Sequence, residues 1–211
     1  WGWTDPTSGK EYALMGLDTG TSFIDISDLE FPRIVGFLPT HTTNSPWRDI
    51  KTYGNFAFIV SEAAGHGVQI FDLTKLKNIS ADQTPETFTS DAHYDGFGSA
   101  HNIVINNAQG YAYAVGTSTF SGGPHFIDIS NPLTPIAAGG YGVDAYSHDA
   151  QVVTYNGPDN DYTGKEILIG SNENEVVIVD VTDKTNPIQI AKIDYPNIGY
   201  THQGWFTEDQ N

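Results

Sequence analysis

One arginine and three histidines recur along this 211-residue chain at a nearly regular spacing. The column they form consists of Arg48, His101, His148 and His202, with steps of 53, 47 and 54 residues. Each member precedes a side chain that carries a carboxylate or an amide. Neutral imidazole and carboxylate are common protein ligands of zinc, copper, iron and manganese. The column therefore predicts a shared metal or ligand site, provided that the fold brings these positions together.

A strand-like phrase repeats four times in phase with this column. Its copies are Phe23–Ser27, Ile70–Thr74, Phe126–Ser130 and Val177–Thr182. A second apolar run precedes each copy of the phrase, and a third apolar run, introduced by a proline, follows several copies. Together with the segment that carries the column residue, which comes first, these runs form one repeating unit. Units of about fifty residues built from four short strands are typical of β-propeller blades. We therefore predict an all-β propeller and no helix of useful length.

The repeat predicts one partial propeller domain. We place blades at 1–40, 46–98, 99–145 and 146–199, and the first strand of a fifth blade at 200–211. Propellers close with roughly four to eight blades, so we expect an N-terminal or central fragment of a seven-bladed propeller. A four-bladed ring closed by the last strand is the alternative. In the fragment, the rest of the propeller or neighbouring chains should cover the open edge.

The first strand of a propeller blade is innermost, so the column should surround the mouth of the central channel. One hypothesis assigns His101, His148, His202 and Asp149 as tentative ligands of a divalent transition metal there. The alternative is structural, because polar residues at these positions also bind the next blade or channel water. Arg48 argues against a cage of four metal ligands, because a guanidinium cannot bind a cation.

Four residues near the predicted rim are candidates for ligand binding, namely Arg48, Asp49, Glu62 and His66. The guanidinium could bind an anionic substrate, or it could pair with Asp49 or Asp149. His66 follows Gly65 in a predicted loop between the second and third strands of its blade. That loop should share the upper rim with the column.

Other acidic residues have two possible roles. Asp159 and Asp161 begin a segment that resembles a calcium loop, but its twelfth position is Gly170 instead of the expected acid. An ordinary Asn/Asp/Gly turn is the alternative to a calcium site. The aspartates of the repeated phrase should instead accept backbone N–H bonds at the blade corners. They are Asp25, Asp72, Asp128 and Asp180.

Composition restricts the partners. Nine Lys and Arg stand against 26 Asp and Glu, a formal net charge of −17, which disfavours binding to nucleic acid. The chain has no cysteine, so disulfides and thiolate sites are excluded. It shows no membrane-spanning segment, and because it begins at Trp1 we expect a segment upstream.

Several longer strings resemble the choice-of-anchor B family, whose members are built from LVIVD-type propeller repeats. They are Trp1–Pro6, Gly20–Ser27, Trp47–Lys51, Ser61–Gly67 and Ser99–Asn102. The resemblance extends over nearly the whole chain. It implies a secreted or surface-displayed bacterial protein, and it implies no particular reaction.

Two functions remain open. We expect an exported bacterial propeller that acts as a binding or scaffolding module through its rim, with a protein or cell-surface partner. The alternative is a metal-dependent enzyme that uses the histidines as ligands. The sequence has no Gly-x-Ser-x-Gly elbow, Walker loop, dinucleotide fingerprint or HExxH motif, so an enzyme would depend on the histidines alone.

Overall fold

The computed structural model describes residues 1–80, 83 and 85–210. Residues 81, 82 and 84 of the predicted second blade and residue 211 of the predicted fifth lie outside the described part. The chain forms two compact units, each described separately below. Unit 1 contains residues 1–99 and 132–134, and unit 2 contains residues 100–131 and 135–211.

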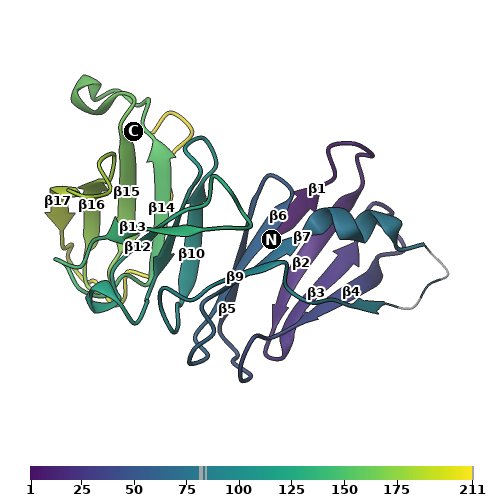
Figure 1. Ribbon diagram of the computed structural model, residues 1–211. Helices are drawn as coiled ribbons and strands as arrows, with labels where there is room; N and C mark the ends of the chain where they lie inside the picture. The colour runs from purple at the N-terminus through teal and green to yellow at the C-terminus, as the bar shows by residue number, and fades with distance from the viewer. Residues whose placement is uncertain (81–82, 84, 211) are drawn as a thin grey trace. The chain divides into compact units, whose positions relative to one another are not determined.

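Unit 1 contains two sheets (Figure 1). Sheet 1 has the order β1 (Gly2–Thr4), β2 (Glu11–Leu17), β3 (Gly20–Asp25), β4 (Arg33–Pro39) and β8 (Glu86–Thr87). Sheet 2 has the order β5 (Arg48–Tyr53), β6 (Phe56–Ser61), β7 (Val68–Asp72) and β9 (Ala92–Tyr94). A short 3₁₀ helix, η1 (Leu73–Asn78), follows β7.

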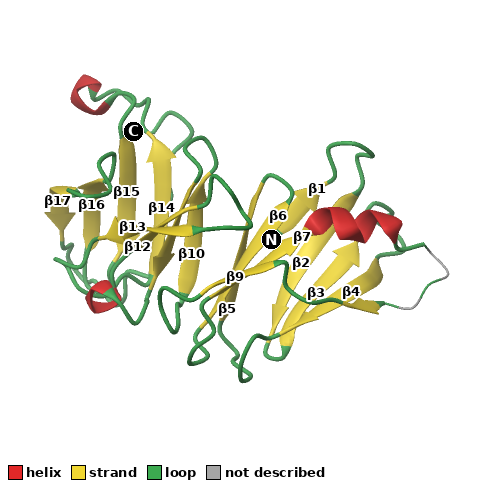
Figure 2. Ribbon diagram, in the orientation of Figure 1, coloured by secondary structure: helices red, strands yellow, loops and turns green. Residues whose placement is uncertain are grey.

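Unit 2 repeats this arrangement. Sheet 3 consists of β10 (Asn102–Asn106), β11 (Tyr111–Val115), β12 (His125–Asp128) and β13 (Ile136–Gly140). Sheet 4 consists of β14 (Asp149–Thr154), β15 (Glu166–Ser171), β16 (Val176–Asp180) and β17 (Ile188–Ile193). The 3₁₀ helices η2 (Phe120–Gly122) and η3 (Asn160–Tyr162) lie in the connections. Figure 2 shows how little helix accompanies the strands.

The four sheets confirm the prediction of propeller blades. In each, four strands pair antiparallel in chain order, as the repeated phrase requires. Two details differ from a simple repeat. The irregular segment 75–98 serves both sheets of unit 1, because β9 is the outer strand of sheet 2 and β8 pairs parallel with β4 of sheet 1.

The first strand of the predicted fifth blade, placed at 200–211, is absent from the part of that range that the structure describes, 200–210. Within the described residues, this segment has a single bridge, between Thr201 and Glu173. A β-strand is stabilised by a continuous ladder of hydrogen bonds to a neighbouring strand, and one bridge does not supply it. The periodicity that correctly locates this segment as the next repeat therefore gives the wrong local structure.

The repeated aspartates have the structural role expected of them. Each ends the third strand of its blade, and its Oδ1 accepts a hydrogen bond from the backbone N–H two residues later, at 2.9–3.0 Å. This side-chain turn closes the corner between the third strand and the following loop. The carboxylates involved belong to Asp25, Asp72, Asp128 and Asp180.

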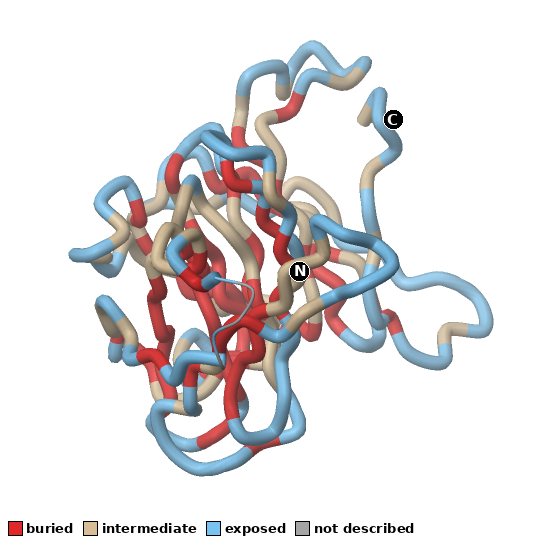
Figure 3. Tube along the Cα trace, turned by 90° about the vertical axis from the view of Figure 1, so that its right-hand side faces the viewer, coloured by how far each residue is buried: buried red, intermediate tan, exposed pale blue. Residues whose placement is uncertain are grey.

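Figure 3 shows the buried residues along the chain, and buried apolar side chains form the core of each unit. In unit 1, Phe23 stacks on Phe71 with ring centroids 4.7 Å apart, and Tyr12 and Leu14 are buried in the same cluster. In unit 2, the cluster includes Tyr113 and Phe126 from sheet 3 together with apolar residues of sheet 4. Burying one such side chain contributes roughly 1.5–3 kcal/mol to folding. These cores hold the strand ends, and so the candidate site residues, in place.

Candidate functional site

The structure places the column residues at equivalent points of the blades. Arg48 is the first residue of β5, and His101 and His148 directly precede β10 and β14. His202 follows the bridge residue Thr201. β5, β10 and β14 are edge strands of their sheets, so Arg48, His101 and His148 lie at the start of the first strand of three blades. His202 lies in a segment with a single bridge, and the position of the column at a channel mouth stays a prediction. Arg48 belongs to unit 1 and the three histidines belong to unit 2.

In unit 1, the Arg48 guanidinium is half-buried and donates to three neutral groups. Nε donates to the Leu17 carbonyl at 3.1 Å, Nη2 to Thr40 Oγ1 at 2.8 Å, and Nη1 contacts His66 Nε2 at 2.9 Å. Burial lowers the pKa of Arg48, and the negative charge of Asp18 opposes that effect. The guanidinium is therefore held in place by uncharged hydrogen-bond partners, and Asp18 acts on it through its charge without a hydrogen bond.

His66 lies in the loop between β6 and β7, as predicted, and is fully buried. Its Nδ1 lies 3.0 Å from the Gly67 carbonyl, which can only accept, so Nδ1 carries a proton. Burial is the main reason why the pKa of His66 falls to about 4, and the charge of Arg48 lowers it further. At neutral pH His66 Nε2 is therefore unprotonated and accepts from Arg48.

The backbone around His66 depends on glycine. Gly67 has φ = +58°, and a Cβ there would lie 2.2 Å from the Tyr94 carbonyl. A side chain at this position would displace the β9 backbone and the imidazole of His93. Of the two glycines that flank His66, Gly65 and Gly67, the second is the one that close packing requires.

Three polar residues complete this group. Gln69 on β7 is buried, and its amide nitrogen donates to the Pro39 carbonyl and to Ser90 Oγ, both at 3.0 Å. Its Oε1 lies 3.1 Å from His66 Nε2; with the His66 proton on Nδ1 both atoms are acceptors, so this contact supplies no hydrogen bond. His93 Nε2 donates to the His66 carbonyl at 2.7 Å. His41 stacks on His93 with ring centroids 3.8 Å apart. We call the set of Arg48, Thr40, His41, His66, Gln69 and His93 the Arg48 cluster.

The charge environment of Arg48 differs from that of every other Lys or Arg in the sequence. Among the described residues, all the others have a carboxylate within 4.0 Å, and Arg48 has none. The predicted pairing with Asp49 is wrong, because Asp49 binds Lys51 at 2.6 Å. In a chain with 26 acidic residues, an arginine without an acidic partner is a specific feature of this position.

Glu62, the remaining ligand candidate, directly follows β6 and is exposed. Its backbone N–H donates to the Trp47 carbonyl at 3.2 Å, next to Arg48 in the chain. Its role in ligand binding stays a prediction.

In unit 2, the three histidine rings are in contact with one another in tilted arrangements. The ring centroid of His148 lies 4.2 Å from that of His101 and 4.1 Å from that of His202, with interplanar angles of 49° and 52°. His148 Nδ1 donates to the His202 carbonyl at 2.9 Å, which leaves Nε2 unprotonated in the neutral ring. Burial lowers the pKa of His148, and the neighbouring imidazoles add to that effect. The structure thus brings the three predicted histidines together, with their rings tilted against one another.

This arrangement gives the metal hypothesis little support. Metal binding needs ring nitrogens directed at one point, and His148 Nδ1 instead donates to the His202 carbonyl. Within the described part of the chain, no group of three or more His, Cys, Asp or Glu could hold a metal ion. Asp149 uses Oδ1 to accept from the Ala150 N–H at 2.7 Å. The assignment of these residues as metal ligands stays a prediction.

The candidate calcium loop forms a turn. Asp159 precedes η3, and its Oδ1 accepts from the Asp161 N–H at 3.1 Å. Asp161 is exposed. This geometry matches the alternative of an ordinary Asp/Asn turn, and the calcium site stays a prediction.

Sequence reasoning identified Arg48 and His66 and missed the other four residues of the Arg48 cluster, Thr40, His41, Gln69 and His93. Gln69 interrupts the apolar run Val68–Phe71, so a buried polar partner for it could have been expected. His93 lies in the irregular segment 75–98 and His41 in a connection, and neither shares the period of the column. Their proximity to Arg48 depends on long-range packing.

Among the described residues, no helix is long and apolar enough to cross a membrane. Comparison with known families finds an LVIVD repeat at residues 164–194, a range that contains β15, β16 and β17. No curated protein matches the chain.

Two solved structures share the fold of this chain. One is the extracellular domain of BT4673 from B. thetaiotaomicron, described as a one-component system, with a TM-score of 0.55 and 15% identity. The other is hydrazine synthase from Kuenenia stuttgartiensis, with a TM-score of 0.52 and 13% identity. The match covers 93% of this chain in both cases, but 24% of the first structure and 54% of the second. The chain therefore contains an LVIVD repeat within β-propeller blades that are shared with much longer proteins.

Proposed function

We propose that this chain belongs to an extracellular or surface-displayed β-propeller that acts as a binding module, and that the Arg48 cluster is its ligand contact. The main support for this proposal is that, among the described residues, Arg48 is the one Lys or Arg that has no carboxylate within 4.0 Å. A half-buried guanidinium that keeps its charge available is suited to bind a group from outside the chain.

The local structure supports this assignment. Arg48 is fixed by hydrogen bonds from two other segments, at Leu17 and Thr40, and by the buried His66. A site that is rigid before the ligand arrives loses less conformational entropy on binding. Loop residues held by a sheet scaffold are also common positions for binding sites.

We also propose that the chain belongs to the choice-of-anchor B family and that the protein is displayed at the cell surface. The strings shared with the choice-of-anchor B family and the LVIVD repeat at residues 164–194 support membership of that family. The extracellular domain with the same fold is consistent with a surface location. Labelling of intact producing cells by an antibody against this chain would support surface display, and labelling only after cell lysis would contradict it.

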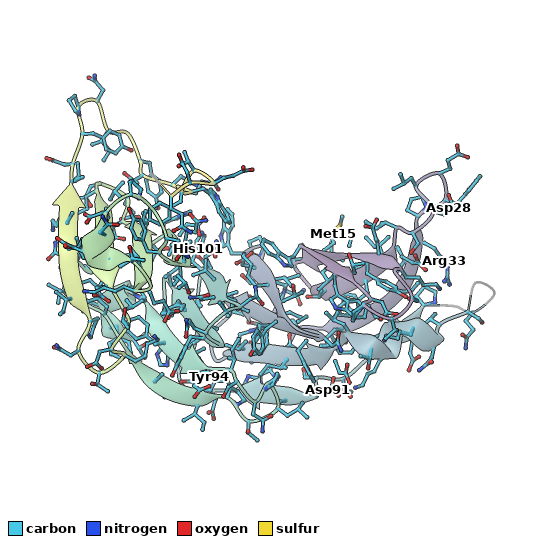
Figure 4. The ribbon with its side chains drawn as sticks, turned by 90° about the horizontal axis from the view of Figure 1, so that it is seen from above. Met15, Asp28, Arg33, Asp91, Tyr94 and His101 are labelled. Carbon is cyan, nitrogen blue, oxygen red and sulfur yellow. The ribbon has the colours of Figure 1, made fainter. Side chains whose placement is uncertain are left out.

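A fragment-binding experiment tests the function. A library of neutral, acidic and basic small molecules is screened by NMR against the wild type, Arg48→Gln and Arg33→Gln. Arg33 is the matched control, because it is the only other arginine in the sequence. Its guanidinium lies 3.8 Å from the Asp25 carboxylate, at the end of β3 and β4 that is opposite to Gly20. Figure 4 shows Arg33 near Asp28 and away from Met15. Met15 precedes Gly16, which lies against Arg48.

We expect a set of compounds to lose at least tenfold in affinity with Arg48→Gln and to bind Arg33→Gln within twofold of the wild type. Equal binding to all three proteins would place the ligand contact elsewhere. Absence of any binding would remove support for a binding module in this part of the protein.

A further inference from the structure

The Arg48 guanidinium retains hydrogen-bond donors that the described residues do not use. A guanidinium has five N–H groups, and three of them meet Leu17, Thr40 and His66. One N–H on Nη1 and one on Nη2 remain. Two donors on the two ends of one planar group match the two oxygens of a carboxylate.

A second polar group near Arg48 also has no partner. Thr21 on β3 is 1% exposed, and its Oγ1 has no hydrogen-bond partner. Thr21 lies directly opposite Gly16 in the β2–β3 ladder, and a Cβ at Gly16 would lie 3.4 Å from Arg48 Cβ. Opposite residues of an antiparallel pair point to the same face, with Cβ atoms about 5 Å apart. The hydroxyl of Thr21 therefore points to the face of sheet 1 that contacts Arg48.

Buried hydroxyl groups without a partner are uncommon and call for an explanation. Here the O–H of Thr21 and the free N–H groups of Arg48 are all donors on one side of sheet 1. The imidazole next to them is neutral, because His66 accepts from Arg48 through Nε2. The set combines several donors with a single positive charge, which suits a monoanion better than a dianion such as phosphate.

We propose that Arg48 and Thr21 bind the carboxylate group of the ligand, Arg48 directly and Thr21 through its hydroxyl or one bridging water. This inference depends on the proposed function, since it names the chemical class recognised by the same site. In this arrangement Thr40 and His66 orient the guanidinium and do not contact the ligand.

The test is an NMR titration of the 211-residue chain at pH 7 and constant ionic strength. The probes are acetate, its neutral analogue acetamide, and inorganic phosphate. We expect acetate to bind with a Kd on the order of 1–10 mM, as suits a four-atom ligand, and to shift the Arg48 side-chain N–H and the Thr21 amide. Acetamide and phosphate should bind at least fivefold more weakly.

Four variants locate the site. Arg48→Gln should weaken acetate binding at least tenfold. Arg48→Lys, which keeps the positive charge but loses the planar pair of N–H donors, should weaken it at least threefold. Thr21→Val, of nearly the same shape, should weaken it about threefold to tenfold. Arg33→Gln should leave it within twofold of the wild type. Circular dichroism and urea unfolding of each variant confirm that the fold is retained, and if Arg48→Gln fails to fold, the Arg48→Lys result decides.

The outcomes separate this inference from the proposed function. Acetamide binding as well as acetate, or phosphate binding more tightly, would overturn carboxylate recognition. Unchanged acetate affinity in Thr21→Val would overturn the role of Thr21. If acetate does not bind but other fragments still depend on Arg48, the carboxylate inference fails and the binding function stands. If no fragment depends on Arg48, both fail.

Discussion

At the scale of single residues, Arg48 shows how a positive charge is kept available in an acidic protein. Carboxylates occur throughout the chain, but those within ion-pair distance serve the other cations, such as Asp49 with Lys51 and Asp25 with Arg33. Neutral acceptors hold Arg48 instead. A nearby carboxylate would stabilise the guanidinium, yet it would also compete with an anionic ligand for the same N–H groups.

His66 predicts a specific pH dependence. Its pKa in the folded protein is about 4, whereas an unfolded histidine has a pKa of about 6.5. Between these two values the unfolded chain binds a proton that the folded chain does not, so the free energy of unfolding falls as pH decreases from about 6.5 to about 4. This one residue accounts for a loss on the order of 3 kcal/mol over that window.

Two measurements check this prediction. The Hε1 resonance of His66 should show no titration between pH 7.5 and 5, and a midpoint near 6.5 would contradict the buried neutral ring. Urea unfolding at several pH values should show a smaller loss of stability toward acid in His66→Gln than in the wild type. Comparison with the variant is needed because burial also lowers the pKa of His125 and His148, which act in the same direction.

At the scale of elements, the repeated aspartates stabilise the corner of each blade. Asp128 is the simplest example, because its Oδ1 accepts from the Ser130 N–H at 2.9 Å, whereas Asp25 also has Lys10 and Arg33 within ion-pair distance. Asp128→Ala should therefore lower the free energy of unfolding by about 1 kcal/mol. Asp128→Asn, which keeps the oxygen acceptor, should lose less than about 0.5 kcal/mol.

Urea unfolding of the two Asp128 variants and the wild type measures this difference. Equal stability of the alanine and asparagine variants would show that the side-chain turn contributes nothing to the corner. The same comparison bears on the sequence repeat, since it tests whether the aspartate in the phrase is retained for structure.

Also at this scale, the last repeat shows a limit of pattern reasoning. The apolar phrases and the column residues predict the sheets of both units, because alternation and turn chemistry are local properties of the chain. The segment from Thr201 carries the same pattern but has one bridge to Glu173. Its pairing depends on a neighbouring strand, which the pattern of the segment itself does not specify.

At the scale of the whole molecule, the net charge of −17 should make stability depend on salt. Uniform negative charge repels itself in the compact state, and added salt screens this repulsion. We expect the free energy of unfolding to increase by about 1 kcal/mol between 10 mM and 200 mM NaCl. Urea is a suitable denaturant, because it is uncharged. A decrease in stability over this range would show that the surface ion pairs outweigh the general repulsion.

The sequence by itself determined the blades, their corners and the column at the blade openings. These features follow from the period of about fifty residues, from strand alternation and from turn residues, all of which act over short distances along the chain. Arg48 and His66 were identified for the same reason, as polar residues at repeated or glycine-flanked positions.

Only the tertiary structure decided which of these residues act together. It paired Asp49 with Lys51 and gave Arg48 uncharged hydrogen-bond partners. It placed Gln69 next to His66, and Thr21 on the face of sheet 1 that contacts Arg48. It also brought the rings of the three histidines into tilted contact. Such contacts depend on side-chain directions and on distances between segments far apart in sequence, which periodicity does not encode.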